Sequence, residues 1–359
     1  MDNRIIRRKT KNLFVGGVGI GSDHRVSVQS MTNTDTHDIE ATYRQVVALR
    51  DSGCDIVRIT APDIESVATF RELIRREVNI PLVADIHFNY KIAIAAIEAG
   101  VNKVRINPGN IGSREKVAEV VRAAKERSVP IRIGVNSGSL EKSILEKYGS
   151  PTPEAISESA LYHASIFEDL DYRDILISVK SSDVYTMIAA NRILAEKTDY
   201  PLHLGVTEAG ARLSAIVKSS IGIGTLLAEG IGDTVRISLT DDPTEEVSAA
   251  REILRSLGLT ENPGMDIVSC PTCGRTEIDL ISLVRDFEDR ARARGLDKKN
   301  VKVALMGCIV NGPGEAREAD IGIAGGKGEG LLFRKGEIIK KVPEDKLLDA
   351  LIWELEKIQ

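Results

Sequence analysis

The stretch K-V-R-I-N, residues 103–107, shows the pattern that decides the fold of this chain. It is a short run of β-branched residues around one arginine, and I-V-R-I-T at 56–60 and I-R-I-G-V-N at 131–136 have the same form. Such runs are typical of β-strands. The runs that we identify cover residues 26–31, 56–60, 82–87, 103–107, 131–136, 175–180, 202–207 and 234–239.

Nearly every run is followed by a segment with helical periodicity, often after an Asp, Ser or Thr that can cap a first turn. The clearest helices are expected at residues 39–52, 64–78, 114–127, 183–197 and 244–257. Strand–helix alternation repeated eight times predicts an α/β fold with an N-terminal (β/α)8 TIM barrel. An open doubly wound sheet is the structural alternative. The stretch G-G-V-G-I-G at 16–21 precedes a strand, so we expect a hairpin capping the barrel floor instead of a dinucleotide-binding loop.

The pattern changes after N-P-G at residues 262–264. Short strands, a helix near 276–295, a hairpin and a final helix at 344–357 indicate a small α+β domain. We therefore divide the chain into a substrate-binding TIM barrel, residues 1–261, and a C-terminal domain, residues 265–359, built around the cysteines.

Three of the four cysteines lie in this last part: Cys270 and Cys273 in S-C-P-T-C-G, and Cys308 in G-C-I-V-N-G-P-G-E. No histidine follows His203, so a metal held here needs a different fourth ligand, and Glu315 is the obvious candidate. Three thiolates without imidazole select an iron–sulfur cluster or zinc. Cys54 lies apart, just before the second strand, and we expect it to be a small buried residue.

Arginines recur inside four of the strands: Arg58, Arg105, Arg132 and Arg236. Their Val and Ile neighbours are expected to face the helices, so alternation points each arginine into the barrel. Lys180 ends another strand and adds a further cation.

Few anionic residues are available to neutralise these cations at the strand ends. The available partners are Asp85, His87 and Glu208. Only two of these are acidic, too few to balance the positive charge of the arginines and Lys180. A structural ion network is one reading. The functional reading is a phosphorylated substrate at the C-terminal ends of the strands, because guanidinium groups match phosphate oxygens. Asn107 and Asn136 supply neutral donors there, and Ser269 is a further candidate substrate contact.

Composition narrows the class of protein. Aromatic residues make up 4% of the chain and the net charge is −5, which argues against binding to nucleic acid or to a membrane surface. The charged start M-D-N-R-I-I-R-R-K resembles no signal segment, and clustered thiols suit a reducing compartment, so we expect a cytoplasmic enzyme.

Several long strings, including V-S-V-Q-S-M-T-N-T, R-I-N-P-G-N, S-C-P-T-C-G-R and N-G-P-G-E-A, closely resemble the bacterial 4-hydroxy-3-methylbut-2-enyl diphosphate synthases of isoprenoid biosynthesis. The resemblance runs from about residue 12 to the C-terminus and indicates the compact two-domain form. It implies one [4Fe–4S] cluster per subunit, held by Cys270, Cys273, Cys308 and Glu315.

The resemblance also implies the reaction. The substrate would be 2-C-methyl-D-erythritol 2,4-cyclodiphosphate, reduced by two electrons from flavodoxin or ferredoxin to 4-hydroxy-3-methylbut-2-enyl diphosphate and water. From the chemistry of this reaction we further expect Glu315 to release its iron when substrate arrives, with Asp85, His87 and Glu208 as candidates for proton delivery. A homodimer is expected, in which the cluster domain of one chain serves the barrel of the other. The alternative is a dihydropteroate-synthase-like barrel transferase with a structural zinc site.

Overall fold

The computed structural model describes residues 5–260, 264–309 and 316–358. The chain forms two compact units, Met1–Thr260 and Glu261–Gln359, and each is described by itself. Within the described residues, no helix is long and apolar enough to span a bilayer.

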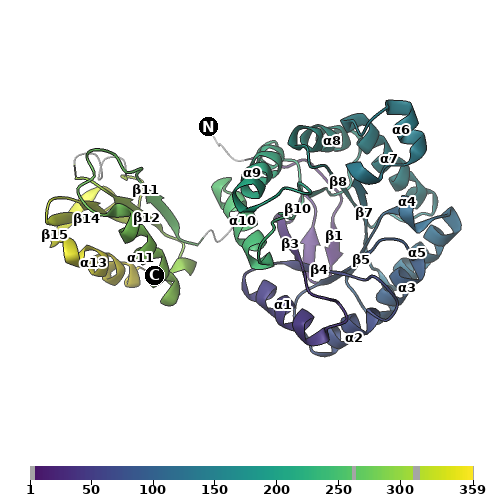
Figure 1. Ribbon diagram of the computed structural model, residues 1–359, viewed down its shortest axis with the longest axis horizontal. Coiled ribbons are helices and arrows are strands. Elements are labelled where there is room, and N and C mark those ends of the chain that lie inside the picture. The colour runs from purple at the N-terminus through teal and green to yellow at the C-terminus, as the bar shows by residue number, and fades with distance from the viewer. Residues whose placement is uncertain (1–4, 261–263, 310–315, 359) are drawn as a thin grey trace. The chain divides into compact units, whose positions relative to one another are not determined.

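The first unit is a (β/α)8 barrel of parallel strands ringed by helices, as the sequence predicts (Figure 1). The strand order is β8-β7-β6-β5-β4-β3-β10-β9, and an isolated parallel bridge between Ile177 and Leu202 connects the two end strands. The open doubly wound sheet is therefore wrong. The strands are β3 (Ser27–Met31), β4 (Ile56–Thr60), β5 (Leu82–Ile86), β6 (Lys103–Ile106), β7 (Ile131–Asn136), β8 (Ile175–Lys180), β9 (His203–Leu204) and β10 (Thr234–Val235).

Several helices begin at side-chain caps that the sequence carries. Asp38, Asp183 and Asp242 each accept a hydrogen bond from a backbone N–H in the first turn of the following helix. The helices of the barrel are α1 (Ile39–Asp51), α2 (Val67–Arg75), α3 (Tyr90–Ala99), α4 (Pro108–Ile111), α5 (Arg114–Arg127), α6 (Lys142–Tyr148), α7 (Pro153–Asp169), α8 (Val184–Lys197), α9 (Arg212–Ala228) and α10 (Pro243–Ser256).

Two strands are shorter than the expected runs 202–207 and 234–239. The N–H of Arg236 still reaches the carbonyl of Leu204 at 3.0 Å, but the N–H of Leu239 bonds to the carboxylate of Glu246 at 3.2 Å. A side chain thus replaces the neighbouring strand as hydrogen-bond partner. The helix expected at 64–78 also starts late, at Val67, because Asp63 accepts from the N–H of Ser66 and holds a turn before it.

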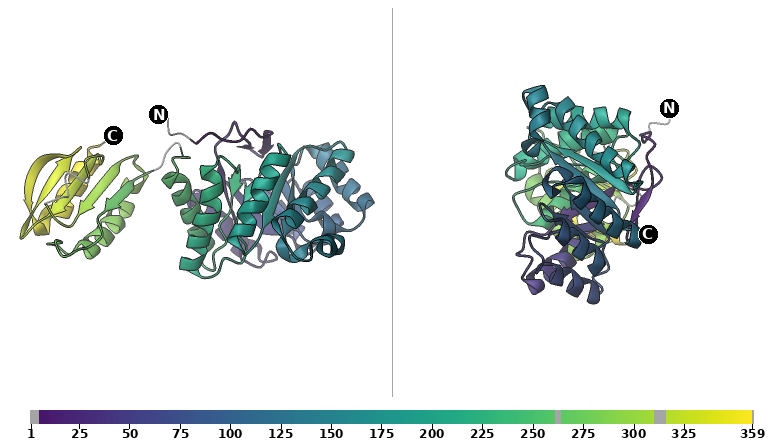
Figure 2. Two further views of the ribbon diagram at one scale, coloured as in Figure 1. Left: turned by 90° about the horizontal axis from the view of Figure 1, so that it is seen from above. Right: turned by 90° about the vertical axis from the view of Figure 1, so that its right-hand side faces the viewer.

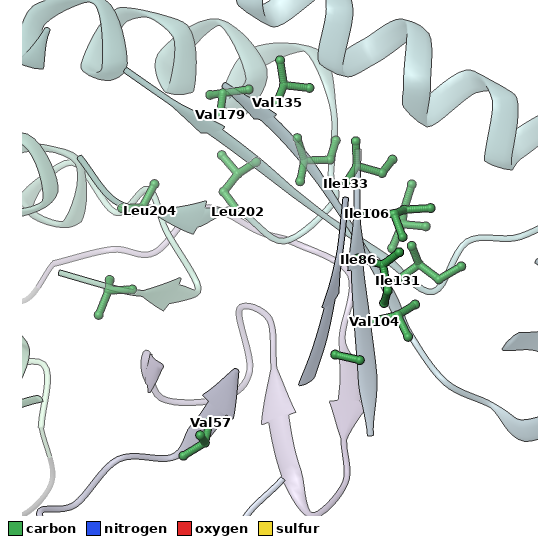
Figure 3. Close-up of a cluster of buried hydrophobic side chains, with 14 of the residues drawn as sticks. Val57, Ile86, Val104, Ile106, Ile131, Ile133, Val135, Val179, Leu202 and Leu204 are labelled. Atoms are coloured by element: carbon green, nitrogen blue, oxygen red, sulfur yellow. The ribbon is translucent and has the colours of Figure 1, made fainter. Parts of the chain in front are cut away.

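Alternation along each strand separates two kinds of side chain. Val57, Val104, Ile131 and Ile133, which flank the strand arginines, are fully buried in the cluster that joins the sheet to the helices. Figure 3 shows these side chains along their strands. The arginines between them therefore point to the opposite face, into the barrel.

A hairpin closes one end of the barrel, as expected (Figure 2). Its strands β1 (Leu13–Val15) and β2 (Val18–Ile20) pair antiparallel. Leu13, Val15 and Ile20 pack in one apolar cluster with the inward residues Ile56, Val83 and Leu176 of the barrel strands. The hairpin is therefore a plug that fills the end of the barrel where the strands begin, opposite the C-terminal end at which the sites of TIM barrels lie.

The second unit is a five-stranded sheet in the order β11-β12-β13-β14-β15, with helices packed on it. The first three strands run parallel and the last three pair antiparallel. Phe287, Leu347 and Leu351 join the helices to the sheet in a separate core. The elements are β11 (Asp266–Ser269), α11 (Leu280–Ala293), β12 (Lys302–Met306), β13 (Ile321–Gly325), β14 (Glu329–Arg334), β15 (Glu337–Pro343) and α13 (Leu347–Glu356).

The plug makes a testable contribution to stability. Ile20→Ala should lower the free energy of unfolding by about 2–5 kcal/mol, because it leaves a cavity in a close-packed cluster. Phe14→Ala on the same hairpin is the control, because that side chain is 60% exposed. Urea unfolding of both variants checks the expectation. Equal losses would show that the hairpin does not pack as a plug.

Candidate functional site

The cations predicted from the strand pattern all lie in the barrel. Arg58, Arg105, Arg132 and Lys180 are buried, and the side chain of Arg236 is 18% exposed. They come from β4, β6, β7, β8 and the residue after β10. The geometry brings like charges together in a water-poor interior, where each raises the free energy of the others.

Asp85, at the end of β5, is the carboxylate among these cations. It lies 3.1 Å from Nη1 of Arg105, 3.6 Å from Nε of Arg58 and 3.6 Å from Nε2 of His87. Burial raises the pKa of Asp85, but Arg58, the nearby imidazole of His87, Arg105 and Arg132 outweigh it and hold the pKa well below its usual range. Asp85 is therefore an anion at neutral pH.

A second buried carboxylate, which sequence reasoning missed, pairs with Arg236. Glu246 of α10 accepts from Nη2 and Nε of Arg236 at 2.8 and 3.1 Å, and from the hydroxyl of Ser30 at 2.8 Å. The bidentate pair fixes Arg236 at the barrel mouth. No local pattern identifies Glu246, because its helix position becomes inward only when the barrel closes.

Two cations have no such partner within the described chain. Neither Arg132 nor Lys180 has a carboxylate within ion-pair distance there, and Nε and Nη1 of Arg132 are buried without a hydrogen-bond partner. Burial, and then the charges of Arg236 and Arg58, hold the pKa of Lys180 well below its ordinary value. Buried cationic N–H donors without partners are groups with which an anionic ligand could pair.

Sequence reasoning also missed a polar layer formed by Lys103, His203 and Gln29. All are buried, and Nζ of Lys103 donates to Oε1 of Gln29 at 3.2 Å. Lys103 could have been found, because it lies two residues before Arg105 on the same strand and so shares its face. His203 is fully buried, and burial followed by the charges of neighbouring cations lowers its pKa well below the ordinary value.

Two glycines make room for the cations. A Cβ at Gly134 would lie 2.4 Å from Nε of Arg105, and one at Gly205 would lie 2.7 Å from Nζ of Lys180. The G in I-R-I-G and in L-H-L-G is thus needed for space at the site.

A pocket of about 460 Å³ opens at the ends of β7, β8 and β9. Its lining residues are Asn136, Ser137, Gly138, Pro151, Ser182, Thr207 and Glu208. Glu208 is exposed and has a backbone φ of +52°, a left-handed conformation that is uncommon for a residue other than glycine. Asn107 caps α4 by accepting from the N–H of Gly109. The predicted neutral and acidic residues thus gather near the C-terminal ends of the strands.

The thiols occupy neighbouring loops of the second unit. Cys270 follows β11, Cys308 follows β12, and these two strands pair in parallel. The N–H of Gly307 donates to Sγ of Cys270 at 3.2 Å, and Cys273 is exposed on the same loop as Cys270, between β11 and α11. Ser269 ends β11 and is exposed. Three soft donors on adjoining loops fit a metal cluster.

Among the described residues, no three His, Cys, Asp or Glu side chains converge closely enough to hold a metal ion. The predicted fourth ligand, Glu315, lies outside the described residues.

Cys54 is separate from the thiol loops: it is buried, donates to the carbonyl of Ile56 at 3.1 Å, and burial raises its pKa to about 12. It is the inert thiol that the sequence led us to expect.

Both units match a known protein family. The GcpE TIM-barrel domain matches residues 10–251, and the GcpE protein C-terminal domain matches residues 266–357. A relative from Clostridium perfringens named 4-hydroxy-3-methylbut-2-en-1-yl diphosphate synthase (flavodoxin) is 59% identical over 98% of this chain and 99% of its own length. One of the same name from Geobacillus thermodenitrificans is 56% identical over 100% of this chain and 94% of its own.

Solved structures show the barrel as well. Type I 3-dehydroquinate dehydratase from Clostridium difficile aligns with a TM-score of 0.53 and 15% sequence identity, over 69% of this chain and 98% of that chain. At this identity the likeness shows the fold alone.

Asp85→Asn tests the electrostatics of the site. The variant should be less stable at pH 7 by about 3–5 kcal/mol, because it leaves buried guanidinium groups without a counter-charge. The depressed pKa of Asp85 makes its contribution complete above its unfolded value of about 3.9 and lost as the pH falls below it. The gap between the two proteins in urea unfolding should therefore narrow towards low pH.

The matched control is Asp169→Asn, which removes an exposed ion pair with Arg114 of 2.9 Å. Such a pair contributes little to stability, and its loss should change the unfolding curve only slightly. A gap between wild type and Asp85→Asn that stays constant from pH 7 to pH 3 would contradict the ion-pair assignment.

Proposed function

The chain belongs to the GcpE family, and from this premise we propose that it has 4-hydroxy-3-methylbut-2-en-1-yl diphosphate synthase activity with flavodoxin as electron donor. The observation that carries the proposal is the surplus of buried cations at the barrel mouth. The substrate, 2-C-methyl-D-erythritol 2,4-cyclodiphosphate, brings two phosphate charges that match this surplus. Arg132 and Lys180, which lack carboxylate partners within the described chain, are the first candidates to receive them.

The assignments of the other barrel residues follow from their surroundings. Arg58 and Arg105 are oriented by Asp85, and Arg236 by Glu246, so each presents a fixed fork to the ligand. Asn107 and Asn136 provide neutral donors at the strand ends. Prealigned donors need no reorganisation when the phosphates arrive.

The reaction opens the ring at the C–O bond to one phosphate and expels a hydroxyl as water. It consumes two electrons and, counted on the fully protonated acids, two protons. Asp85 is ionised at neutral pH and cannot supply a proton, so its role is electrostatic. Glu208, which lines the mouth pocket, and His87, which lies beside Asp85, remain the candidates for proton delivery.

The thiol loops would hold the cofactor, a [4Fe–4S] cluster, one per subunit. Cys270, Cys273 and Cys308 supply the thiolates, and Glu315 is the proposed fourth ligand. When bound, the cluster supplies low-potential electrons, and the protein residues around it control its exposure and potential. Thiolates of this kind need a reducing setting, which is why cytoplasmic location is part of the proposal.

A dihydropteroate-synthase-like transferase with structural zinc was the alternative from the sequence. It predicts relatives with that activity along the full chain. The full-length relatives at 59% and 56% identity instead carry the synthase name, and they include the cysteine domain. This alternative is therefore wrong.

Topology supports a homodimer. Arg251, in the second half of α10, contacts the carbonyl of Gly53 just before β4, so α10 returns to the floor of the barrel. The N–H of Leu259 still donates to the carbonyl of Leu254 at 2.9 Å, so only residues 260–265 remain to link α10 with β11. At roughly 3.5 Å per residue these six residues reach about 21 Å, less than a barrel height of about 30 Å. We therefore assign the cluster domain of each chain to the barrel of its partner in a closed two-fold pair.

Replacing Cys270, Cys273 or Cys308 by Ser should abolish the cluster and turnover. The barrel should remain folded, because it has its own core. Anaerobic reconstitution, followed by electron paramagnetic resonance with and without the cyclic diphosphate and by turnover with reduced flavodoxin, measures both effects. Cys54→Ser is the control and should keep cluster and activity. Stoichiometric zinc in place of iron and sulfide in the wild-type protein would refute the proposed function.

Mixing two inactive variants tests the dimer. A Cys308→Ser chain retains an intact barrel, and an Arg132→Ala chain retains an intact cluster domain. Heterodimers formed by co-expression should recover activity, because one barrel then meets one functional cluster domain. Each variant mixed with itself should remain inactive. A fully active monomer in sedimentation velocity would overturn the arrangement.

A further inference from the structure

Lys103 lies in the barrel interior, in the layer next to the cations of the mouth. It is fully buried, and its side-chain hydrogen bond goes to a neutral amide, Oε1 of Gln29 at 3.2 Å. Gln29 comes from β3 and Lys103 from β6, so the bond crosses the barrel. Lys103 has no carboxylate within ion-pair distance in the described part of the chain.

Among the charged groups of the barrel, Arg132 on β7 and Arg58 on β4 act on Lys103. The other charged or titratable groups of the interior and mouth are Asp85 on β5, Arg105 on β6 itself, Lys180 on β8, His203 on β9, Arg236 after β10 and Glu246 on α10. The two carboxylates of this set are already engaged, Asp85 by Arg58 and Arg105, and Glu246 by Arg236. Any further positive charge is therefore uncompensated.

The chemistry of the side chains decides which cations can give up charge. A guanidinium group does not lose its proton in proteins, whereas an amine does so readily when buried. Arg132 is in register with Arg105 on the neighbouring strand and must stay charged. The buried lysines are therefore the groups that can lose a proton and lower the positive charge. Burial, and then the charges of Arg132 and Arg58, lower the pKa of Lys103 well below its ordinary value, in agreement with this argument.

We propose that Lys103 is a neutral amine in the free protein and takes up a proton when the cyclic diphosphate binds at the barrel mouth. The identity of the ligand rests on the proposed function. The proton is supplied by solvent, no bond of the ligand changes in this step, and the nitrogen gains one N–H. As a neutral amine, Lys103 adds no unpaired positive charge to the free barrel. When an anion binds, the protonated Lys103 adds one positive charge near it.

Lys180 can titrate for the same reason, but its position differs. It ends β8 next to the mouth, where it is proposed to contact the ligand, whereas Lys103 lies on the inner layer with Gln29. The contribution of Lys103 is therefore measured as the difference in proton uptake between the wild type and a variant in which only Lys103 is replaced.

Isothermal titration calorimetry measures this uptake directly. Each phosphorus of the cyclic diphosphate has one ester bond and one anhydride bond, which leaves one strongly acidic oxygen. The ligand therefore keeps its charge from pH 6 to pH 9, and any proton taken up belongs to the protein. Binding enthalpies at pH 8 in buffers of different ionisation enthalpy should show net proton uptake by the wild type. Lys103→Met should bind more weakly and take up about one proton fewer.

Lys125→Met is the matched control, because Lys125 is an exposed lysine on α5 of the same unit. It should match the wild type in affinity and in proton uptake. Zero uptake by the wild type, or equal uptake by wild type and Lys103→Met, would overturn the proposal. Absence of any binding to the wild type would instead refute the proposed function.

A second measurement uses the wild-type protein alone and needs no substituted variant. In protein labelled with ¹³C at lysine Cε, the free wild type should show at pH 7 a lysine with the chemical shift of a neutral amine. Addition of the cyclic diphosphate should move that signal to the ammonium position. Lysine signals that are all ammonium-like in the free protein would contradict the inference, whatever the calorimetry shows.

Discussion

The contact between Asp85 and its two arginines is the interaction on which the barrel interior depends. Arg58 and Arg105 come from strands on either side of β5, and a single carboxylate holds both. Buried guanidinium groups without a counter-charge would destabilise the fold, while full neutralisation would remove the attraction for an anion. The partial balance keeps the barrel folded and leaves it attractive to phosphate.

The rest of the barrel is arranged around this imbalance. The hairpin plug fills the floor with apolar side chains, so the charged layers are confined to the middle and the mouth. Gly134 and Gly205 leave the volume that Arg105 and Lys180 occupy. Glu246 clamps Arg236 from outside the sheet. The two glycines thus provide the space for the cations, and Glu246, from a helix, fixes the orientation of Arg236. The strands alone would only bring the positive charges close together.

The two units divide the chemistry by the kind of donor that each presents. The barrel offers positively charged N–H donors that suit phosphate oxygens. The second unit offers soft thiol ligands on the loops after β11 and β12. Each unit has its own apolar core, so the proposed substrate site and the proposed cluster site belong to separately packed parts of the chain. Membership of the GcpE family accounts for the presence of both sets in one chain.

The sequence by itself determined the strand–helix repeat, the inward direction of Arg58, Arg105 and Arg132, and the separation of Cys54 from the other cysteines. These follow from period-two alternation and spacing, which are local properties. Only the tertiary structure decided that Glu246 pairs with Arg236 and that Gln29 meets Lys103. The reason is physical: such contacts join strands and helices far apart in the chain, and they depend on the register and closure of the barrel, which no local pattern encodes.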